Sequence, residues 1–135
     1  MPEYYFNLPP FDDLNSPQKS AVTDDNAIAL SGGPGTGKSV VSLWRHILNH
    51  KRENPIHSQL LTYTTSLALY LKECCYTQSV NASNYVDSSK HWRIHSANQR
   101  AEIIHDEAQD LPLAFNKELS NYSTKISYGA DNQQL

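Results

Sequence analysis

Hydrophobic residues along this chain follow two spacings, and segments of the two kinds alternate. Short apolar runs predict buried strands at 27–30, 58–64, 103–104 and 125–128. Apolar residues with helical spacing follow the first two runs. The apolar face of the first helix consists of Val40, Val41, Leu43, Trp44, Ile47 and Leu48. The apolar face of the second helix consists of Leu67, Tyr70, Leu71 and Cys74. The alternation predicts an α/β fold, with a mostly parallel sheet covered by flanking helices.

Capping residues predict where two of the helices begin. Ser16 is the expected N-cap of a helix that has Pro17 in its first position. Thr65 or Ser66 is available to cap the helix that carries the second apolar face. These signals place one short helix before the first strand and one helix after the second strand.

Three segments are less regular. Residues 1–16 predict an irregular arm, separate from a domain at 17–135, that packs through Tyr5, Phe6 and Phe11. Residues 49–54 predict a polar linker after the first long helix. In residues 77–99 the periodicity is weak, and the segment suggests at most a short strand near Trp92 and Ile94.

The first chemical motif comes directly after the first predicted strand. Gly32-Gly33-Pro34-Gly35-Thr36-Gly37-Lys38-Ser39 fits the P-loop pattern of Gly, four residues, Gly-Lys and then Ser or Thr. Backbone N–H groups of such a loop turn around a polyphosphate, and the following helix offers its positive N-terminal end to the same anion. Lys38 is expected to reach the β- and γ-phosphates, and the Ser39 hydroxyl to ligate Mg²⁺. The other residues expected to contact the nucleotide are Gly33, Gly35, Thr36 and Gly37.

The second chemical motif ends the third predicted strand. His105 stands in that strand, where we expect a core or edge histidine with satisfied hydrogen bonds. Asp106 and Glu107 come next, and a P-loop enzyme uses such a pair to hold Mg²⁺ and to orient or deprotonate the attacking water. Asp110 then predicts the cap of a helix with an apolar face of Leu111, Phe115 and Leu119.

Length and charge restrict the class of protein. At 135 residues, the chain has the length of one domain. A net charge of -3 gives no overall basic surplus for nucleic-acid binding, although a local basic groove is compatible with it. The first residues lack the pattern of a secretory signal, and no apolar run approaches the length of a membrane span. A cytoplasmic protein without membrane contact is expected.

Together, the motifs resemble the N-terminal part of the first RecA-like lobe of superfamily 1 DNA helicases of the UvrD/Rep type. The glycine motif is similar to their motif I, and residues 15–22 are similar to their Q motif. Asp106-Glu107-Ala108-Gln109-Asp110 resembles their motif II, whose fourth-place glutamine distinguishes these helicases from most other P-loop proteins. The resemblance implies a P-loop NTPase fold with ATP and Mg²⁺ as cofactors.

The same resemblance implies roles for single residues. Gln18 would contact adenine, Gln109 would belong to the nucleotide site, and Glu107 would be the base for water. Residues 61–65 are similar to motif Ia, where Tyr63 and Thr64 would touch single-stranded DNA. Residues 130–135 resemble motif III, in which Gln134 would sense the γ-phosphate.

The parts of such helicases that lie beyond motif III are missing from this chain, including the second RecA-like lobe with its catalytic arginines. The resemblance therefore implies a truncated first lobe that couples ATP hydrolysis to DNA translocation only in a longer protein. Alone, it is expected to be inactive or nearly so. Two alternatives remain: a helicase-like module that binds nucleotide without turnover, and a self-sufficient small NTPase or kinase.

Overall fold

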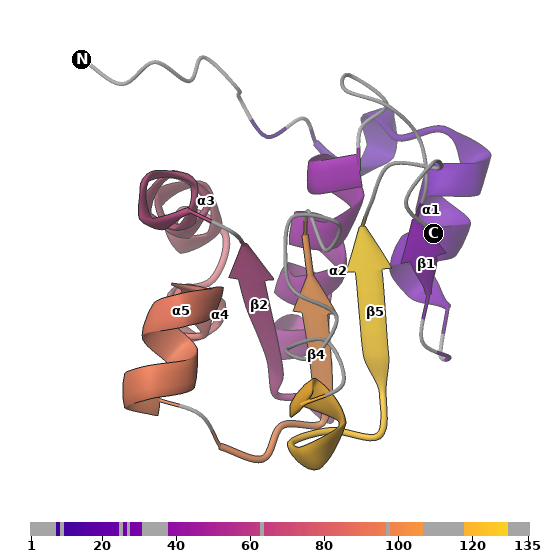
Figure 1. The fold of residues 1–135 in the computed structure, drawn as a ribbon. Coiled ribbons are helices and arrows are strands. Elements are labelled where there is room, and N and C mark those ends of the chain that lie inside the picture. The colour runs from indigo at the N-terminus through magenta and orange to yellow at the C-terminus, as the bar shows by residue number, and fades with distance from the viewer. Residues whose placement is uncertain are drawn as a thin grey trace.

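A sheet of five parallel strands forms the centre of the structure (Figure 1). The computed structural model describes residues 8, 10–24, 26, 28–30, 38–62, 64–96, 98–106 and 118–129. In spatial order the strands are β1 (Ala29–Leu30), β5 (Ile126–Gly129), β4 (Glu102–His105), β2 (Ser58–Thr62) and β3 (Val86–Ser88). Because every strand pair is parallel, all five carboxyl ends lie at one edge of the sheet, which we call the carboxyl edge.

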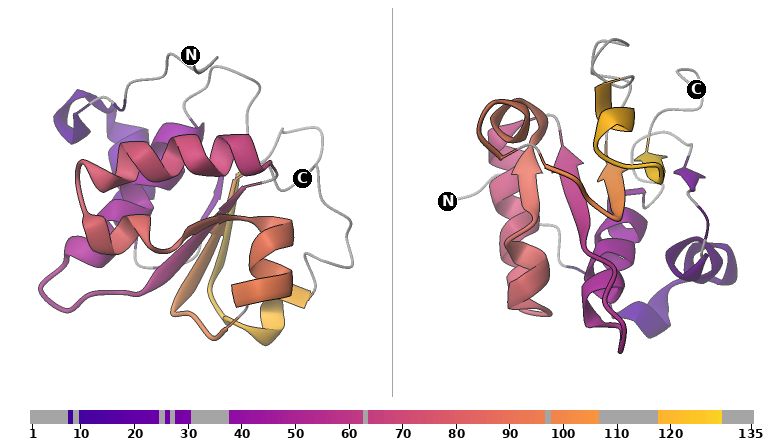
Figure 2. Two further views of the ribbon diagram at one scale, coloured as in Figure 1. Left: turned by 90° about the vertical axis from the view of Figure 1, so that its left-hand side faces the viewer. Right: turned by 90° about the horizontal axis from the view of Figure 1, so that it is seen from below.

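Helices cover both faces of the sheet, so that the described structure has three layers (Figure 2). One face packs against α1 (Ser16–Thr23), α2 (Lys38–Lys51), α3 (Thr65–Tyr76) and α4 (Val80–Ser83). The opposite face packs against the helical turns α5 (Ser89–His91), η2 (Trp92–Ser96) and η4 (Leu119–Asn121). A further turn, η1 (Phe11–Asp13), precedes α1, and Phe11 packs edge-on against Trp44. No helix in the described ranges is long and apolar enough to cross a bilayer.

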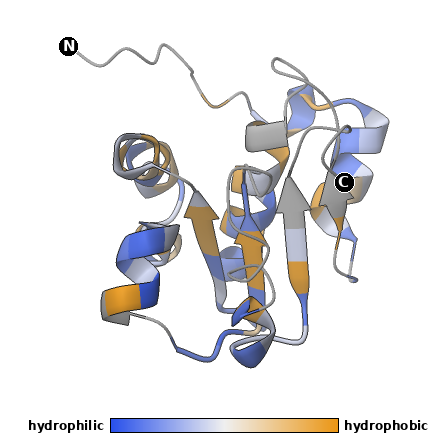
Figure 3. Ribbon diagram, viewed as in Figure 1, coloured by the Kyte–Doolittle hydropathy of each residue, from blue (hydrophilic) through white to orange (hydrophobic). Residues whose placement is uncertain are grey.

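The alternation of side chains along the strands produces two cores. On β2 and β4, Leu60 and Ile104 point to the α2 face, whereas Leu61 and Ile103 point to the opposite face. All four side chains are buried, and the middle of each of these two strands is apolar (Figure 3). Strands that are buried on both sides read as continuous apolar runs, which is why the sequence predicts them well.

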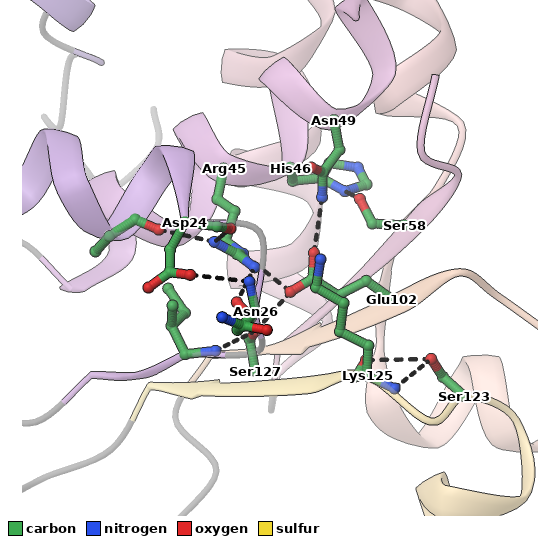
Figure 4. A network of polar contacts seen from close by, with 12 residues as sticks. Asp24, Asn26, Arg45, His46, Asn49, Ser58, Glu102, Ser123, Lys125 and Ser127 are labelled. Carbon is green, nitrogen blue, oxygen red and sulfur yellow. Dashed lines mark hydrogen bonds and ion pairs between the residues drawn. The ribbon is translucent and has the colours of Figure 1, made fainter. Parts of the chain in front are cut away.

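A buried polar network joins α2 to the amino ends of β4 and β5 (Figure 4). The Arg45 Nε donates to Glu102 Oε2 over 2.9 Å, and both side chains are almost fully buried. Glu102 also accepts hydrogen bonds from Asn49 and Ser127. The two Nη atoms of Arg45 donate to the main-chain oxygens of Ala21, Asp24 and Asn26. One guanidinium therefore holds the end of α1 and the approach to β1 against α2 and β4.

A buried histidine fixes α2 to β2 in the same region. His46 Nδ1 lies 2.8 Å from Ser58 Oγ, and His46 Nε2 lies 2.8 Å from the Ala82 carbonyl oxygen. Burial, together with the nearby His50, lowers the pKa of His46 to about 3. The neutral ring donates through Nε2 and accepts through Nδ1, so that both nitrogens are satisfied.

The predicted strands and the two predicted long helices are confirmed, and so is the burial of Trp44. The predicted caps are wrong by one residue, since Asn15 caps α1 and Thr64 caps α3 through their side-chain oxygens. The prediction of a linker at 49–54 is also wrong for its first three residues. There α2 continues to Lys51, because Asn49 and His50 are buried and hydrogen-bonded to β4 and β2.

The segment 77–99 is more structured than its sequence suggests. It forms α4, β3, α5 and η2, and Trp92 and Ile94 lie in a helical turn instead of a strand. Trp92 nevertheless belongs to the core, while Ile94 is exposed. Tyr5, Phe6 and the helix start predicted at Asp110 lie outside the described residues, although Leu119 is buried in η4.

Candidate functional site

Apart from the Q motif at residues 15–22, which lies in and just before α1, the motifs found in the sequence come after the carboxyl ends of strands. The glycine motif leaves β1, Tyr63 leaves β2, Glu107 and Gln109 follow β4, and Gln134 follows β5. These loop residues, 31–37, 63, 107–117 and 130–135, lie outside the described residues. The strand ends that precede these loops are described by the structure. Because the strands are parallel, these ends all lie at the carboxyl edge. The points where four segments far apart in sequence leave the sheet thus lie at one edge.

The glycine motif lies between a strand and a helix, as a phosphate-binding loop requires. The strand β1 ends at Leu30, and α2 begins at Lys38. Lys38 and Ser39 therefore occupy the first turn of α2, where backbone N–H groups have no partner within the helix and the helix dipole is positive. This end of α2 suits an anion.

Asp106 lies directly beyond β4 and keeps the register of the sheet. Its backbone N–H donates to the Leu61 carbonyl oxygen over 2.8 Å, which extends the β2–β4 pairing by one residue. The side chains of Glu102 and Ile104 point to the α2 face, so alternation places the Asp106 side chain on that face too. Asp106 is completely buried.

The register gives Asp106 two neighbours on that face of the sheet. Continuing the pairing of His105 with Leu61 and Tyr128 places Asp106 between Thr62 on β2 and Gly129 on β5. Adjacent strands lie about 4.8 Å apart, so these three positions form a short row at the carboxyl edge. Gly129 adds no side chain to the row.

Three hydrogen bonds between α2 and the strands show which residues of α2 lie beside this row. His46 bonds to Ser58 at the start of β2, and the row lies four residues further along the strand, at Thr62. Four strand residues cover about 13 Å, which equals about nine residues of helix. The helix α2 is antiparallel to the strands, so these nine residues are counted from His46 toward the start of α2. The row therefore lies level with the first residues of α2, Lys38 and Ser39. Counting from the bonds of Arg45 and Asn49 to Glu102 gives the same level for Asp106.

The opposite side of β4 holds a second polar group at the same edge. His105 Nε2 lies 2.8 Å from Ser89 Oγ, and the Ser89 hydroxyl donates to the Thr62 carbonyl oxygen over 3.0 Å. Burial lowers the pKa of His105 to about 4, so the ring is neutral and donates to Ser89 through Nε2. The expectation of a core histidine is confirmed, with a hydrogen bond at Nε2. Ser89 thereby ties the ends of β2 and β4 together.

Sequence reasoning missed both Ser89 and Thr62. The pair Ser88-Ser89 is the sequence signal that could have indicated Ser89, because it marks the start of a helix. Ser88 caps α5 by accepting a hydrogen bond from the His91 N–H, and Ser89 is the first residue of that helix. Thr62 stands inside a strand that the sequence predicts correctly, and only the register shows that it faces Asp106.

Gln18 lies on α1, which packs against α2, and it is half-buried. Its side-chain oxygen accepts from the Asn15 N–H, while the Asn15 side chain accepts from the Gln18 N–H, each over 2.9 Å. This reciprocal pair is a capping box, which by itself accounts for the residue pattern at 15–18. The adenine contact of Gln18 stays a prediction.

Thr64 also has a structural role. Its hydroxyl oxygen accepts from the Leu67 N–H over 3.1 Å and caps α3, and the residue is exposed. It stands where the chain leaves β2 at the carboxyl edge, so the cap is compatible with the predicted contact to single-stranded DNA. That contact stays a prediction, as does that of the neighbouring Tyr63.

All four arginines of the sequence lie in described residues, and each is placed away from the row. Arg45 is enclosed in the Glu102 network, and Arg93 pairs with Glu118 over 2.9 Å. Arg52 follows the end of α2, and Arg100 precedes β4, stacked 5.0 Å over the Tyr85 ring. Arg52 and Arg100 are therefore at the amino ends of the strands, opposite the candidate site.

Searches with models of protein families and among curated proteins find no match to this chain. The candidate site is therefore defined by the motif residues of the sequence and by the strand ends and helix start next to them. An α/β domain with an all-parallel, helix-covered sheet is compatible with a RecA-like fold.

Proposed function

We propose that this chain binds Mg·ATP at the carboxyl edge of its sheet, as the nucleotide-binding part of a superfamily 1 type DNA helicase. The proposal rests on one observation, the position along α2 of the row formed by Thr62, Asp106 and Gly129. Asp106, the expected metal ligand, lies level with Lys38 and Ser39, which begin the helix after the glycine motif. A phosphate loop and a metal-binding carboxylate must meet in this way to share one nucleotide.

The route of the chain supports the same location. The connection from β1 to β2 crosses the α2 face, whereas the connection from β4 to β5 places η4 on the opposite face. Open parallel sheets bind ligands outside the carboxyl ends of their strands, where neighbouring connections leave in opposite directions. The proposed site has that position.

Each motif residue would have its own part in the chemistry. Lys38 and the loop amides bind the phosphates, while Ser39 and Asp106 hold Mg²⁺, which neutralises charge on the phosphates when bound. Glu107 orients and deprotonates the attacking water, and Gln134 senses the γ-phosphate. The Asp106 backbone N–H bond to Leu61 fixes where the acidic pair leaves the sheet.

Two further parts of the proposal concern DNA and the rest of the motor. Tyr63 and Thr64 would contact single-stranded DNA where the chain leaves β2, with a base stacked on the Tyr63 ring. A second RecA-like lobe would supply the motion, because translocation needs two lobes that close on ATP and open after hydrolysis.

The placement of the arginines favours a second reading for the chain by itself, namely nucleotide binding without efficient turnover. An arginine at the γ-phosphate is typically worth about 10³ to 10⁵ in rate, and each arginine of this chain lies away from the row. In isolation the chain is therefore expected to bind Mg·ATP and to hydrolyse it very slowly.

A pair of lysine variants tests the proposal. Lys38→Ala removes the mobile positive charge that the phosphates require, so binding of labelled Mg·ATP should weaken at least tenfold, an effect of about 1.4 kcal/mol. Lys51→Ala removes an exposed lysine from the other end of the same helix and should bind like the wild type. Equal affinity of both variants, with circular dichroism showing intact folds, would exclude a nucleotide site at the start of α2.

A further inference from the structure

Thr62 is an unusual residue for the end of a buried strand. It is completely buried, and its hydroxyl has no hydrogen-bond partner among the residues that the structure describes. A buried hydroxyl without a partner opposes folding, whereas valine has the same shape and avoids that cost. The hydroxyl therefore calls for an explanation outside the packing of the sheet.

The position of Thr62 explains why a hydroxyl is found there. It lies directly beside Asp106 in the row, on the α2 face and level with Lys38 and Ser39. Its main-chain oxygen accepts from the buried Ser89 hydroxyl on the opposite side of the sheet. That bond holds the end of β2 in place, and with it the direction of the Thr62 side chain.

We infer that Thr62 is a further positioning residue of the metal site: its hydroxyl hydrogen-bonds a water molecule in the hydration shell of the Mg²⁺ held by Asp106. The inference rests on the proposed function. Mg²⁺ keeps several of its waters when it binds a protein through one or two carboxylates, so it needs polar groups around those waters. A fully buried hydroxyl one strand away from the carboxylate meets that need.

Other roles for Thr62 fit less well. Contact with DNA is excluded by its complete burial, and the capping of α3 is performed by Thr64. Ser42 offers a useful comparison, because its hydroxyl is likewise buried and lacks a partner within the described ranges. It lies one turn before His46 on α2, which is the level of the apolar pair Leu60 and Ile104 and not of Asp106.

The experiment compares Thr62→Val with Ser42→Ala, each in the whole chain. Binding of ADP is titrated over a range of Mg²⁺ concentrations, and thermal unfolding is measured without ligand. Both variants should keep or raise the unfolding temperature. Only Thr62→Val should weaken the apparent Mg²⁺ affinity, by about three- to tenfold, the usual effect of one hydrogen bond. Thr62→Ser retains the hydroxyl and should restore the affinity for Mg²⁺.

Several results would overturn the inference. Unchanged Mg²⁺ affinity in Thr62→Val, with normal Lys38-dependent ADP binding, would refute the role of Thr62 and leave the nucleotide site intact. A lower unfolding temperature for Thr62→Val would show that the hydroxyl serves the fold. Equal Mg²⁺ effects in Thr62→Val and Ser42→Ala would show that neither acts specifically. A wild-type chain that binds no nucleotide would refute the proposed function and this inference together.

Discussion

Replacing Arg45 with methionine removes the centre of the buried network at the amino ends of β4 and β5. The Arg45 and Glu102 side chains are only 1% and 0% exposed, so water cannot take the place of the guanidinium beside the carboxylate. Breaking a buried ion pair by removing one partner typically costs about 3 to 5 kcal/mol, because the remaining charge is uncompensated. Asn49 and Ser127 still donate to Glu102, which limits the cost to that range.

An exposed pair provides the control. Arg93 and Glu118 form a bridge of the same length, but their side chains are 57% and 32% exposed. Arg93→Met should therefore cost less than about 1 kcal/mol, as screened surface pairs do. The buried residues Trp44 and Trp92 report unfolding in urea by fluorescence. A stability loss for Arg45→Met no larger than that for Arg93→Met would refute this description of the network.

A second variant separates charge from packing. Glu102→Gln in the Arg45→Met background removes the uncompensated carboxylate while keeping its approximate shape. The double variant should be more stable than Arg45→Met alone, by roughly 1 to 3 kcal/mol, since a buried neutral amide costs less than a buried charge. If the double variant is the less stable of the two, the cost of Arg45→Met arises from lost packing and not from the charge on Glu102.

Three further predictions concern single residues. The pKa values of His46 and His105 are lowered to about 3 and about 4 in the folded chain. As the pH falls below 6.5, the two rings are therefore protonated in the unfolded chain before they are protonated in the folded chain. Each should therefore remove roughly 2 kcal/mol of stability between pH 8 and pH 5, measurable as a fall in the urea midpoint, and a flat profile would contradict the buried, neutral rings. Asn15→Ala should cost about 1 kcal/mol by loss of the capping box, whereas Ser16→Ala should cost much less because Asn15 is the cap. In a protein that includes a second lobe, Glu107→Gln should keep ATP binding and lose hydrolysis, and unchanged turnover would assign the base to another residue.

The sequence predicts the strands and long helices well because their buried faces are apolar. It fails where the buried face is polar. Asn49 reads as a linker residue, yet it lies in α2 because its amide donates to Glu102, a partner far away in sequence. The same applies to Ser89, whose partners are Thr62 and His105. Periodicity counts such residues as exposed, since it contains no information on distant hydrogen-bond partners.

For the candidate site, the sequence predicts which residues come after the strand ends, because glycine and acidic motifs have recognisable local patterns. It does not predict which residues become neighbours across the sheet. The row of Thr62, Asp106 and Gly129 depends on strand order and register, which are set by the packing of the whole domain.

The most direct test of a shared phosphate and metal site is a titration of a non-hydrolysable ATP analogue, with and without Mg²⁺, into wild type, Lys38→Ala and Asp106→Asn. Lys38 acts on the phosphates, so its loss should weaken binding in both conditions. Asp106 acts through the metal, so its replacement should weaken binding only when Mg²⁺ is present and should leave metal-free binding unchanged or tighter. The same loss for Asp106→Asn with and without Mg²⁺, or no loss in either condition, would contradict a metal site at the end of β4 beside the first turn of α2.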